Sequence, residues 1–258
     1  MLKKRIIPKF LIRGGRLVKC RRFFDDQREA GNPVSTAKVY DSYGIDELIF
    51  VDIDATPQGR AVTGSIIERV SEEVFIPFTV GGGITSLVQI EALLKSGADK
   101  VSINSAAIAD PGFVTAAASR FGDQCIVASI DYREEEDGAK KVFSRCGSDA
   151  TGMDAIEWAL RMQDAHAGEI LMTCIDRDGM MTGYDLDMIA ALSDKLDVPL
   201  IASSGAGSLD DCTKALAAGA SAITISSMFI FTDHSPIKVR TYLSTNGVPV
   251  RSQKGSRS

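Results

Sequence analysis

One stretch of the sequence occurs twice, 122 positions apart. Residues 98–105 read ADKVSINS, and residues 220–227 read ASAITISS. In both copies a short run rich in β-branched residues ends in small polar residues, and a glycine, Gly97 or Gly219, stands directly before it. Self-similarity over such a distance indicates a chain built from repeated units. We therefore expect two similar halves, each containing this strand.

The rest of the chain alternates short apolar runs with amphipathic segments. Apolar runs without polar alternation indicate parallel strands that are covered on both faces by helices. Eight such strand–helix units in 258 residues fit a single (β/α)8 TIM barrel of the α/β class. A doubly wound sheet is disfavoured because no G-x-G-x-x-G motif follows the first strand. The expected strands span residues 5–12, 47–54, 76–80, 98–105, 124–131, 169–176, 199–203 and 220–227.

The domain prediction follows from the repeat. The barrel is expected over residues 1–250, with half-barrels at about 1–122 and 123–250, and a polar C-terminal tail over 251–258. Residues 133–147 carry an acidic run with Gly138, which favours an exposed hairpin turn or a mobile loop.

Composition excludes several classes of function. A net charge of −5 gives no basic surface for nucleic acid, and no apolar run approaches the ~20 residues that cross a bilayer. The start of the chain does not read as a signal peptide. Five cysteines without a C-x-x-C pair are typical of reduced thiols in the cytoplasm. The two histidines lie far apart, so we expect no metal and no cofactor.

Glycines and small polar residues end two matching pairs of strands. Gly81–Gly83 and residues 204–207 (SGAG) follow the third and seventh strands, while Asn104-Ser105 and Ser226-Ser227 follow the fourth and eighth. Glycines let backbone N–H groups converge on an anion, and TIM barrels often bind phosphate after strands seven and eight. We expect a phosphate site at Gly83, Asn104 and Ser105, and another at Gly205, Ser226 and Ser227. The alternative is that the glycines only permit tight turns.

Asp131 ends the fifth strand and is the candidate catalytic residue, because a carboxylate at the barrel mouth can transfer protons or orient a substrate. The repeat places Leu11 at the equivalent end of the first strand. Other candidates for substrate binding lie at neighbouring strand ends, where exposed charge or core packing is the alternative. They are Lys19, Thr173, Asp178, Gly179 and Ser203.

Charged residues of both signs mark the opposite ends of four strands. Arg5, Glu47, Lys100 and Glu169 stand at strand starts and could form an ion-pair ring that closes the barrel. Routine charges that keep strand ends soluble are the alternative.

The sequence closely resembles the cyclase subunit of imidazole glycerol phosphate synthase, the barrel half of a glutamine amidotransferase of histidine biosynthesis. The resemblance covers residues 2–250, and specific segments include 78–84, 97–105 and 175–179. It implies that a glutaminase subunit docks at the N-terminal face, forming a heterodimer, and supplies ammonia through a gate of Arg5, Glu47, Lys100 and Glu169. It also implies two phosphate sites for a bis-phosphorylated ribosyl substrate, with Asp178 and Gly179 in the second, Lys19 as a substrate-binding lysine, and Asp131 as one of two catalytic aspartates.

The sequence departs from this family at Leu11, where the resemblance implies the other catalytic aspartate. Ser204, where a second glycine is usual, is a milder departure. Leucine cannot transfer a proton, and one positioned acid or base contributes about 10²–10⁴-fold in rate. With Leu11 the sequence also resembles divergent relatives of this subunit from surface-polysaccharide (O-antigen) biosynthesis. This second resemblance implies a barrel that docks a glutaminase and delivers ammonia. A separate sugar amidotransferase would then use the ammonia to form an amidine on an acetamido sugar.

Two functions therefore stay open: an ammonia-using cyclase subunit, favoured by the phosphate sites and Asp131, and an ammonia-channelling barrel, favoured by Leu11. The sister isomerase of histidine biosynthesis, also a two-phosphate barrel, resembles the sequence less.

Overall fold

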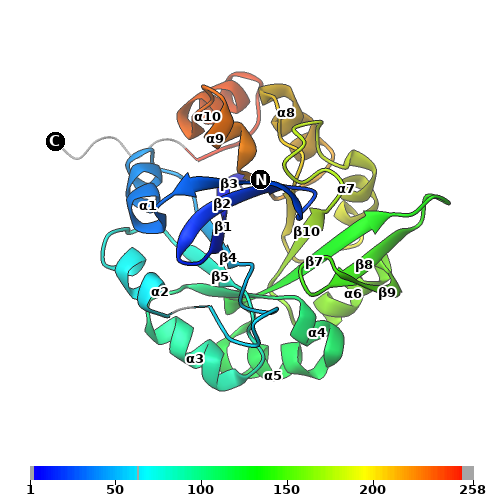
Figure 1. Ribbon diagram of the computed structural model, residues 1–258. Helices are drawn as coiled ribbons and strands as arrows, with labels where there is room; N and C mark the ends of the chain where they lie inside the picture. Colours follow the sequence, from blue (N-terminus) through cyan, green and yellow to red (C-terminus); the bar gives the residue numbers. More distant parts are fainter. Residues whose placement is uncertain (1–2, 63, 252–258) are drawn as a thin grey trace.

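The computed structural model describes residues 3–62 and 64–251. Within them, eight parallel strands close into a barrel that a ring of helices surrounds (Figure 1). The barrel is closed where β12 pairs with β1 and where β7 pairs with β10. The fold predicted from the sequence is confirmed. The barrel strands are β1 (Arg5–Arg13), β4 (Leu48–Asp52), β5 (Phe78–Gly81), β6 (Lys100–Ile103), β7 (Ile126–Glu134), β10 (Glu169–Cys174), β11 (Leu200–Ser203) and β12 (Ala222–Ile225).

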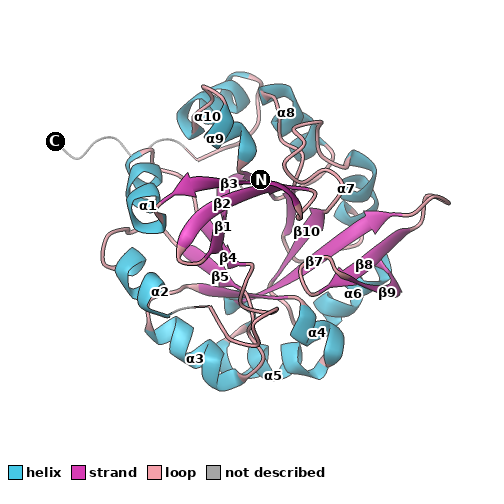
Figure 2. Cartoon of the chain, in the orientation of Figure 1, coloured by secondary structure: helices cyan, strands magenta, loops and turns pink. Residues whose placement is uncertain are grey.

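Helices follow the strands and cover the outside of the barrel (Figure 2). Side chains that cap the first turn fix where several of the helices begin. At the first helix, for example, the Asn32 side chain accepts hydrogen bonds from Val34 N and Ser35 N. The helices are α1 (Pro33–Ser42), α2 (Gly64–Ser71), α3 (Leu87–Lys95), α4 (Ser105–Ala109), α5 (Gly112–Phe121), α6 (Ala155–Asp164), α7 (Leu186–Ser193), α8 (Leu209–Ala217), α9 (Ser227–Phe231) and α10 (Pro236–Thr245), with a 3₁₀ turn η1 (Asp123–Cys125).

The 122-residue separation recurs in the helix caps. Ser86 and Ser208 begin α3 and α8, and each forms a capping box with the third residue of its helix, Gln89 or Asp211. The small polar residues that end the repeated strand also have one structural role, because Ser105 opens α4 and Ser227 opens α9. The boundary between half-barrels predicted near residue 122 stays a prediction.

Two antiparallel additions extend strands of the barrel. β2 (Arg16–Arg21) and β3 (Asp25–Gly31) follow β1, and β2 pairs with both β1 and β3. β8 (Lys140–Ser144) pairs with β7 and β9 (Asp149–Asp154) pairs with β8, and the turn between β7 and β8 projects beyond the helix ring in Figure 1. The segment expected to be a hairpin turn or mobile loop is therefore an ordered hairpin. Residues 252–258 of the predicted tail lie outside the described residues.

The core has two parts. The larger packs the strands against the helices. The smaller is a separate apolar cluster that comprises Ile7, Ile49, Val127, Leu171, Ile201 and Ala222, with Val51 against it. All of these residues belong to barrel strands and form a layer apart from the helix-facing core. No helix among the described residues has the length and apolarity to cross a membrane.

Candidate active site

Two cavities adjoin at the carboxyl ends of the barrel strands. The larger, of about 280 Å³, contains Gly83, Asn104, Ser105 and Asp131 in its wall. The smaller, of about 20 Å³, is lined by the second predicted phosphate set, Asp178, Gly179, Gly205, Ser226 and Ser227. Lys19 and Ser203, which were predicted separately as substrate-binding residues, line it too.

Both cavities share three lining residues: Lys9, Leu11 and Asp178. The structure therefore brings both predicted sets to one barrel mouth, on either side of the end of β1.

Asp131 is a buried acid in the wall of the larger cavity. Asn104 Nδ2 donates a hydrogen bond of 2.7 Å to Asp131 Oδ2. Burial raises the pKa of Asp131 to about 6, against the opposing effects of Lys9 and the Asn104 hydrogen bond. A carboxyl with a pKa near 6 changes protonation close to neutral pH, as a general acid or base requires. Asp131 is therefore equipped for proton transfer.

Gly83 and Gly205 occupy positions that only glycine fits. Both have positive φ, and a Cβ on Gly83 would lie 1.8 Å from Arg60 O, while one on Gly205 would lie 2.1 Å from Gly183 O. The two turns are therefore tightly packed, which agrees with the alternative interpretation that these glycines permit tight turns. Their position in the cavity walls also leaves bare backbone facing the space where a ligand would lie.

Polar atoms without partners distinguish these turns from purely structural ones. Asn104 Oδ1, Ser226 Oγ and Ser227 Oγ are buried and form no hydrogen bond within the described residues. Buried polar groups are normally paired, so an orphaned atom calls for a partner from outside the chain. All three belong to residues that line the two cavities, one in the first set and two in the second.

Lys19 is buried on β2 and forms an ion pair with Asp178, with Nζ to Oδ2 and Oδ1 distances of 2.8 and 3.0 Å. The alternative of an exposed charge is therefore wrong for Lys19, because the unpredicted hairpin folds its side chain into the cavity wall. Asp178 also accepts a hydrogen bond of 3.1 Å from Ser204 Oγ. The ion pair holds the second predicted phosphate site together from one side.

The remaining predicted residues lie in or near the mouth. Thr173 and Ser203 are buried inside the barrel, where their hydroxyls contact Lys9 Nζ. Ser105 Oγ accepts a hydrogen bond of 2.9 Å from Arg145 N, which ties the β8–β9 turn to the first site.

Lys9 was not predicted as a site residue, because a single lysine in an apolar strand is usually an outward-facing, exposed charge. The signal available in the sequence was its two-residue spacing from Leu11, which places both side chains on one face of β1.

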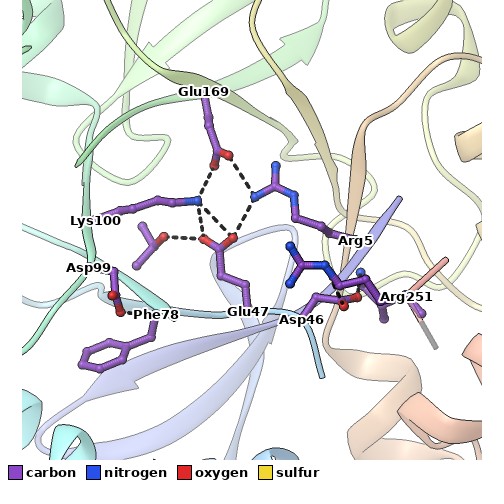
Figure 3. A network of polar contacts seen from close by, with 10 residues as sticks. Arg5, Asp46, Glu47, Phe78, Asp99, Lys100, Glu169 and Arg251 are labelled. Atoms are coloured by element: carbon purple, nitrogen blue, oxygen red, sulfur yellow. Dashed lines mark hydrogen bonds and ion pairs between the residues drawn. The ribbon is translucent and has the colours of Figure 1, made fainter. Parts of the chain in front are cut away.

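At the other end of the barrel, Arg5, Glu47, Lys100 and Glu169 form a closed ring of alternating charge (Figure 3). Arg5 Nη1 lies 2.7 Å from Glu47 Oε2 and 2.8 Å from Glu169 Oε1. Lys100 Nζ lies 3.1 Å from a carboxylate oxygen of each glutamate. Thr79 Oγ1 donates a further hydrogen bond of 2.8 Å to Glu47 Oε1. Side-chain exposure of the four is 4–17%, so the ring is largely desolvated.

Among residues 3–62 and 64–251, no three His, Cys, Asp or Glu side chains gather in a way that could hold a metal ion.

A closed β/α barrel with two adjoining cavities at the carboxyl ends of its strands defines the class: a (β/α)8 TIM barrel with its candidate site at the barrel mouth, where sites of this fold lie. The family model described as histidine biosynthesis protein matches residues 5–235. The chain therefore belongs to the histidine biosynthesis protein family.

Similarity to individual relatives narrows this assignment. The chain is 46% identical over 252 residues to the imidazole glycerol phosphate synthase subunit HisF of Dehalococcoides mccartyi strain 195, covering 97% of this chain and 99% of the relative. The subunits of the same name from strains BAV1 and CBDB1 are 45% identical over the same shares. Within the family, the chain thus falls with the cyclase-type HisF subunits, as its sequence predicted.

Proposed function

We propose that this chain is the cyclase subunit of an imidazole glycerol phosphate synthase, which binds a bis-phosphorylated ribosyl substrate at the barrel mouth and uses ammonia delivered by a glutaminase. The observation that carries the proposal is the pair of adjoining cavities, one with Asp131 and the unpartnered Asn104 Oδ1, the other with the unpartnered hydroxyls of Ser226 and Ser227. A phosphate at one end of the ligand would accept hydrogen bonds from the Ser226 and Ser227 hydroxyls, while Asn104 Oδ1, an acceptor, would take a hydrogen bond from a ligand hydroxyl or N–H group beside Asp131.

Proton transfer in this proposal falls to Asp131. The pKa of about 6 lets the carboxyl accept a proton from the substrate at neutral pH and return it in a later step. Asn104 holds one carboxylate oxygen of Asp131 through a hydrogen bond of 2.7 Å, which restricts the orientation of the carboxyl group. Lys19 and Asp178 keep the loop of the second site in place.

Ammonia entry is assigned to the opposite end. The ring of Arg5, Glu47, Lys100 and Glu169 lies where the strands begin, and the apolar cluster around Ile7, Val127 and Leu171 lies on the same strands between the ring and the mouth. A path lined by apolar side chains suits a neutral molecule such as ammonia, because ammonium would lose its hydration there. The ring would have to open for passage, so we assign it the role of a gate.

The glutaminase is expected to dock on the face that carries the gate. Phe75 is 92% exposed and stands just before β5, at the N-terminal end of the barrel. A large exposed aromatic side chain of this kind is typical of an interface residue. We propose a heterodimer that uses this face.

The ammonia-channelling barrel is the second candidate, and Leu11 is the observation that favours it. Leu11 lines both cavities, where an aspartate would complete a pair of acids with Asp131. In that role the chain would dock a glutaminase and pass ammonia to a sugar amidotransferase, without its own cyclase reaction.

A steady-state assay separates the two candidates. With an ammonium salt and the bis-phosphorylated ribosyl substrate, the cyclase assignment predicts turnover in the range of ordinary enzymes, ~1–10³ s⁻¹. An Asp131→Asn variant measured in parallel gives the background. Absence of turnover above this background in the wild type, with recovery in Leu11→Asp, would favour the channelling barrel.

A further inference from the structure

Lys9 is a buried lysine at the junction of the two cavities. Its residue exposure is 8%, and it lines both spaces together with Leu11 and Asp178. A ligand that extends from Gly83 and Asn104 to Gly205 and Ser226 would pass over this junction. Lys9 is therefore placed beside the middle of such a ligand, where neither pair of loops reaches.

The hydrogen-bond partners of Lys9 within the described residues include no carboxylate. Its Nζ donates to two neutral hydroxyls, Thr173 Oγ1 and Ser203 Oγ, each at 3.2 Å. Among the described residues it forms no ion pair, whereas Lys19 in the same wall is held by both oxygens of Asp178. An ammonium has three donors, so one remains for a partner outside the protein.

A cation buried without a carboxylate partner is costly to the fold. Burial lowers the pKa of Lys9, and the negative charges of Asp178 and Asp131 act against this effect. Removing the amine would leave Ser203 with another partner, since Thr224 Oγ1 donates a hydrogen bond of 2.9 Å to Ser203 Oγ. The position is therefore better explained by a ligand than by stability.

The two halves of the barrel differ at this level. The offset that matches Leu11 with Asp131 matches Lys9 with Ser129, which also lines the larger cavity. One half thus presents a cation below a leucine, and the other a hydroxyl below an acid. At these four matched positions there is one acid, Asp131, and one lysine, Lys9, instead of two opposed acids.

We propose that Lys9 is a substrate-contacting residue that donates a hydrogen bond to a ligand oxygen midway between the two phosphate sites, an oxygen that carries or develops negative charge. The site would accordingly select ligands with a carbonyl, enolate or carboxylate oxygen at this point. The inference takes the identity of the ligand from the proposed function, but the contact itself is independent of the reaction.

Calorimetric titration of the bis-phosphorylated ribosyl substrate tests the contact. Lys9→Met keeps the length of the side chain without donors, and Lys9→Gln keeps a donor without charge. Because both variants lose a charged hydrogen bond, the dissociation constant should rise about 10- to 100-fold in each. Lys214→Met, which removes a surface lysine paired with Asp210, should bind within twofold of the wild type.

Binding of both Lys9 variants within twofold of the wild type would overturn the contact and leave the proposed function intact. Failure of the wild type itself to bind would contradict the proposed function instead. In that case inorganic phosphate serves as the probe. Its binding is followed by NMR through the Nζ signal of Lys9 in ¹⁵N-lysine-labelled protein, and this signal is assigned by its loss in Lys9→Met. Movement of that signal on adding phosphate supports an anion contact, and a static signal excludes it. Melting curves show whether each variant is folded.

Discussion

Asn104 Nδ2 donates a 2.7 Å hydrogen bond to Asp131 Oδ2, while the other side-chain atom of the same amide, Oδ1, is buried without a partner. One side chain thus links the acid of the larger cavity to the end of the repeated strand. The unused oxygen indicates that the amide is arranged for a donor on a ligand. This contact joins the two features on which the proposed chemistry depends.

Replacing Asp131 with Asn should abolish most of the activity. The amide keeps the shape of the side chain but cannot carry a proton, so kcat with ammonium should fall by about 10²–10⁴-fold. The measurement is steady-state turnover, with substrate affinity determined separately. A fall confined to KM would contradict the assignment, because it would mean that Asp131 only binds.

The same variant should be more stable than the wild type at alkaline pH. The pKa of Asp131 is raised from 3.8 to about 6, so the native state binds the proton more tightly than the unfolded chain, and stability is lost as pH rises through 6. The gain in unfolding free energy for Asp131→Asn should reach at most about 3 kcal/mol above pH 7. Urea unfolding at pH 8 and pH 4 checks this: a gain that does not shrink on acidification would show that the carboxyl is not perturbed.

Ser226→Ala should weaken ligand binding without a loss of stability. Ser226 Oγ has no hydrogen-bond partner in the described protein, so its removal should change the unfolding free energy by less than about 0.5 kcal/mol. Affinity for the bis-phosphorylated substrate should fall about tenfold, the range of one hydrogen bond to a charged group.

A matched control for this prediction is Ser208→Ala. Ser208 Oγ accepts a hydrogen bond from Asp211 N at the start of α8, so its loss should cost about 1 kcal/mol of stability while affinity is unchanged. Equal affinity of Ser226→Ala and wild type would remove this hydroxyl from the proposed phosphate site.

Lys100→Ala should uncouple the glutaminase from the barrel. The change leaves Glu47 and Glu169 with Arg5 as their common cation, so the ring opens and its geometry is lost. Glutamine-driven turnover should fall relative to ammonium-driven turnover, because ammonium enters from solution at the mouth.

The control here is Lys95→Ala, which breaks an exposed i,i+4 pair with Glu91 and should leave both activities unchanged. If Lys100→Ala preserves both docking and the ratio of the two activities, the gate assignment is wrong.

The barrel could be predicted because its strands are buried on both faces and its repeat is visible in the sequence. Residues 47–54 and 76–80, for example, became β4 and β5 with ends shifted by one or two positions. The ring of charges at the strand starts could be predicted for the same reason, since parallel strands place their first residues at one end of a barrel.

Contacts between distant segments could not be predicted. Lys19 and Asp178 are 159 positions apart, and their ion pair depends on the β2–β3 hairpin, whose polar second strand has no apolar alternation. Lys9 reads as an exposed charge, although the barrel closes around it. The orphaned Ser226 Oγ is visible only when every neighbour is in place.

The decisive measurement is ammonium-driven turnover of the bis-phosphorylated ribosyl substrate by the wild-type chain. If the proposed cyclase function holds, turnover should saturate with substrate, fall about 10²–10⁴-fold in Asp131→Asn and need no glutaminase. A wild type no faster than Asp131→Asn, with activity appearing in Leu11→Asp, would contradict it and assign the chain to ammonia delivery.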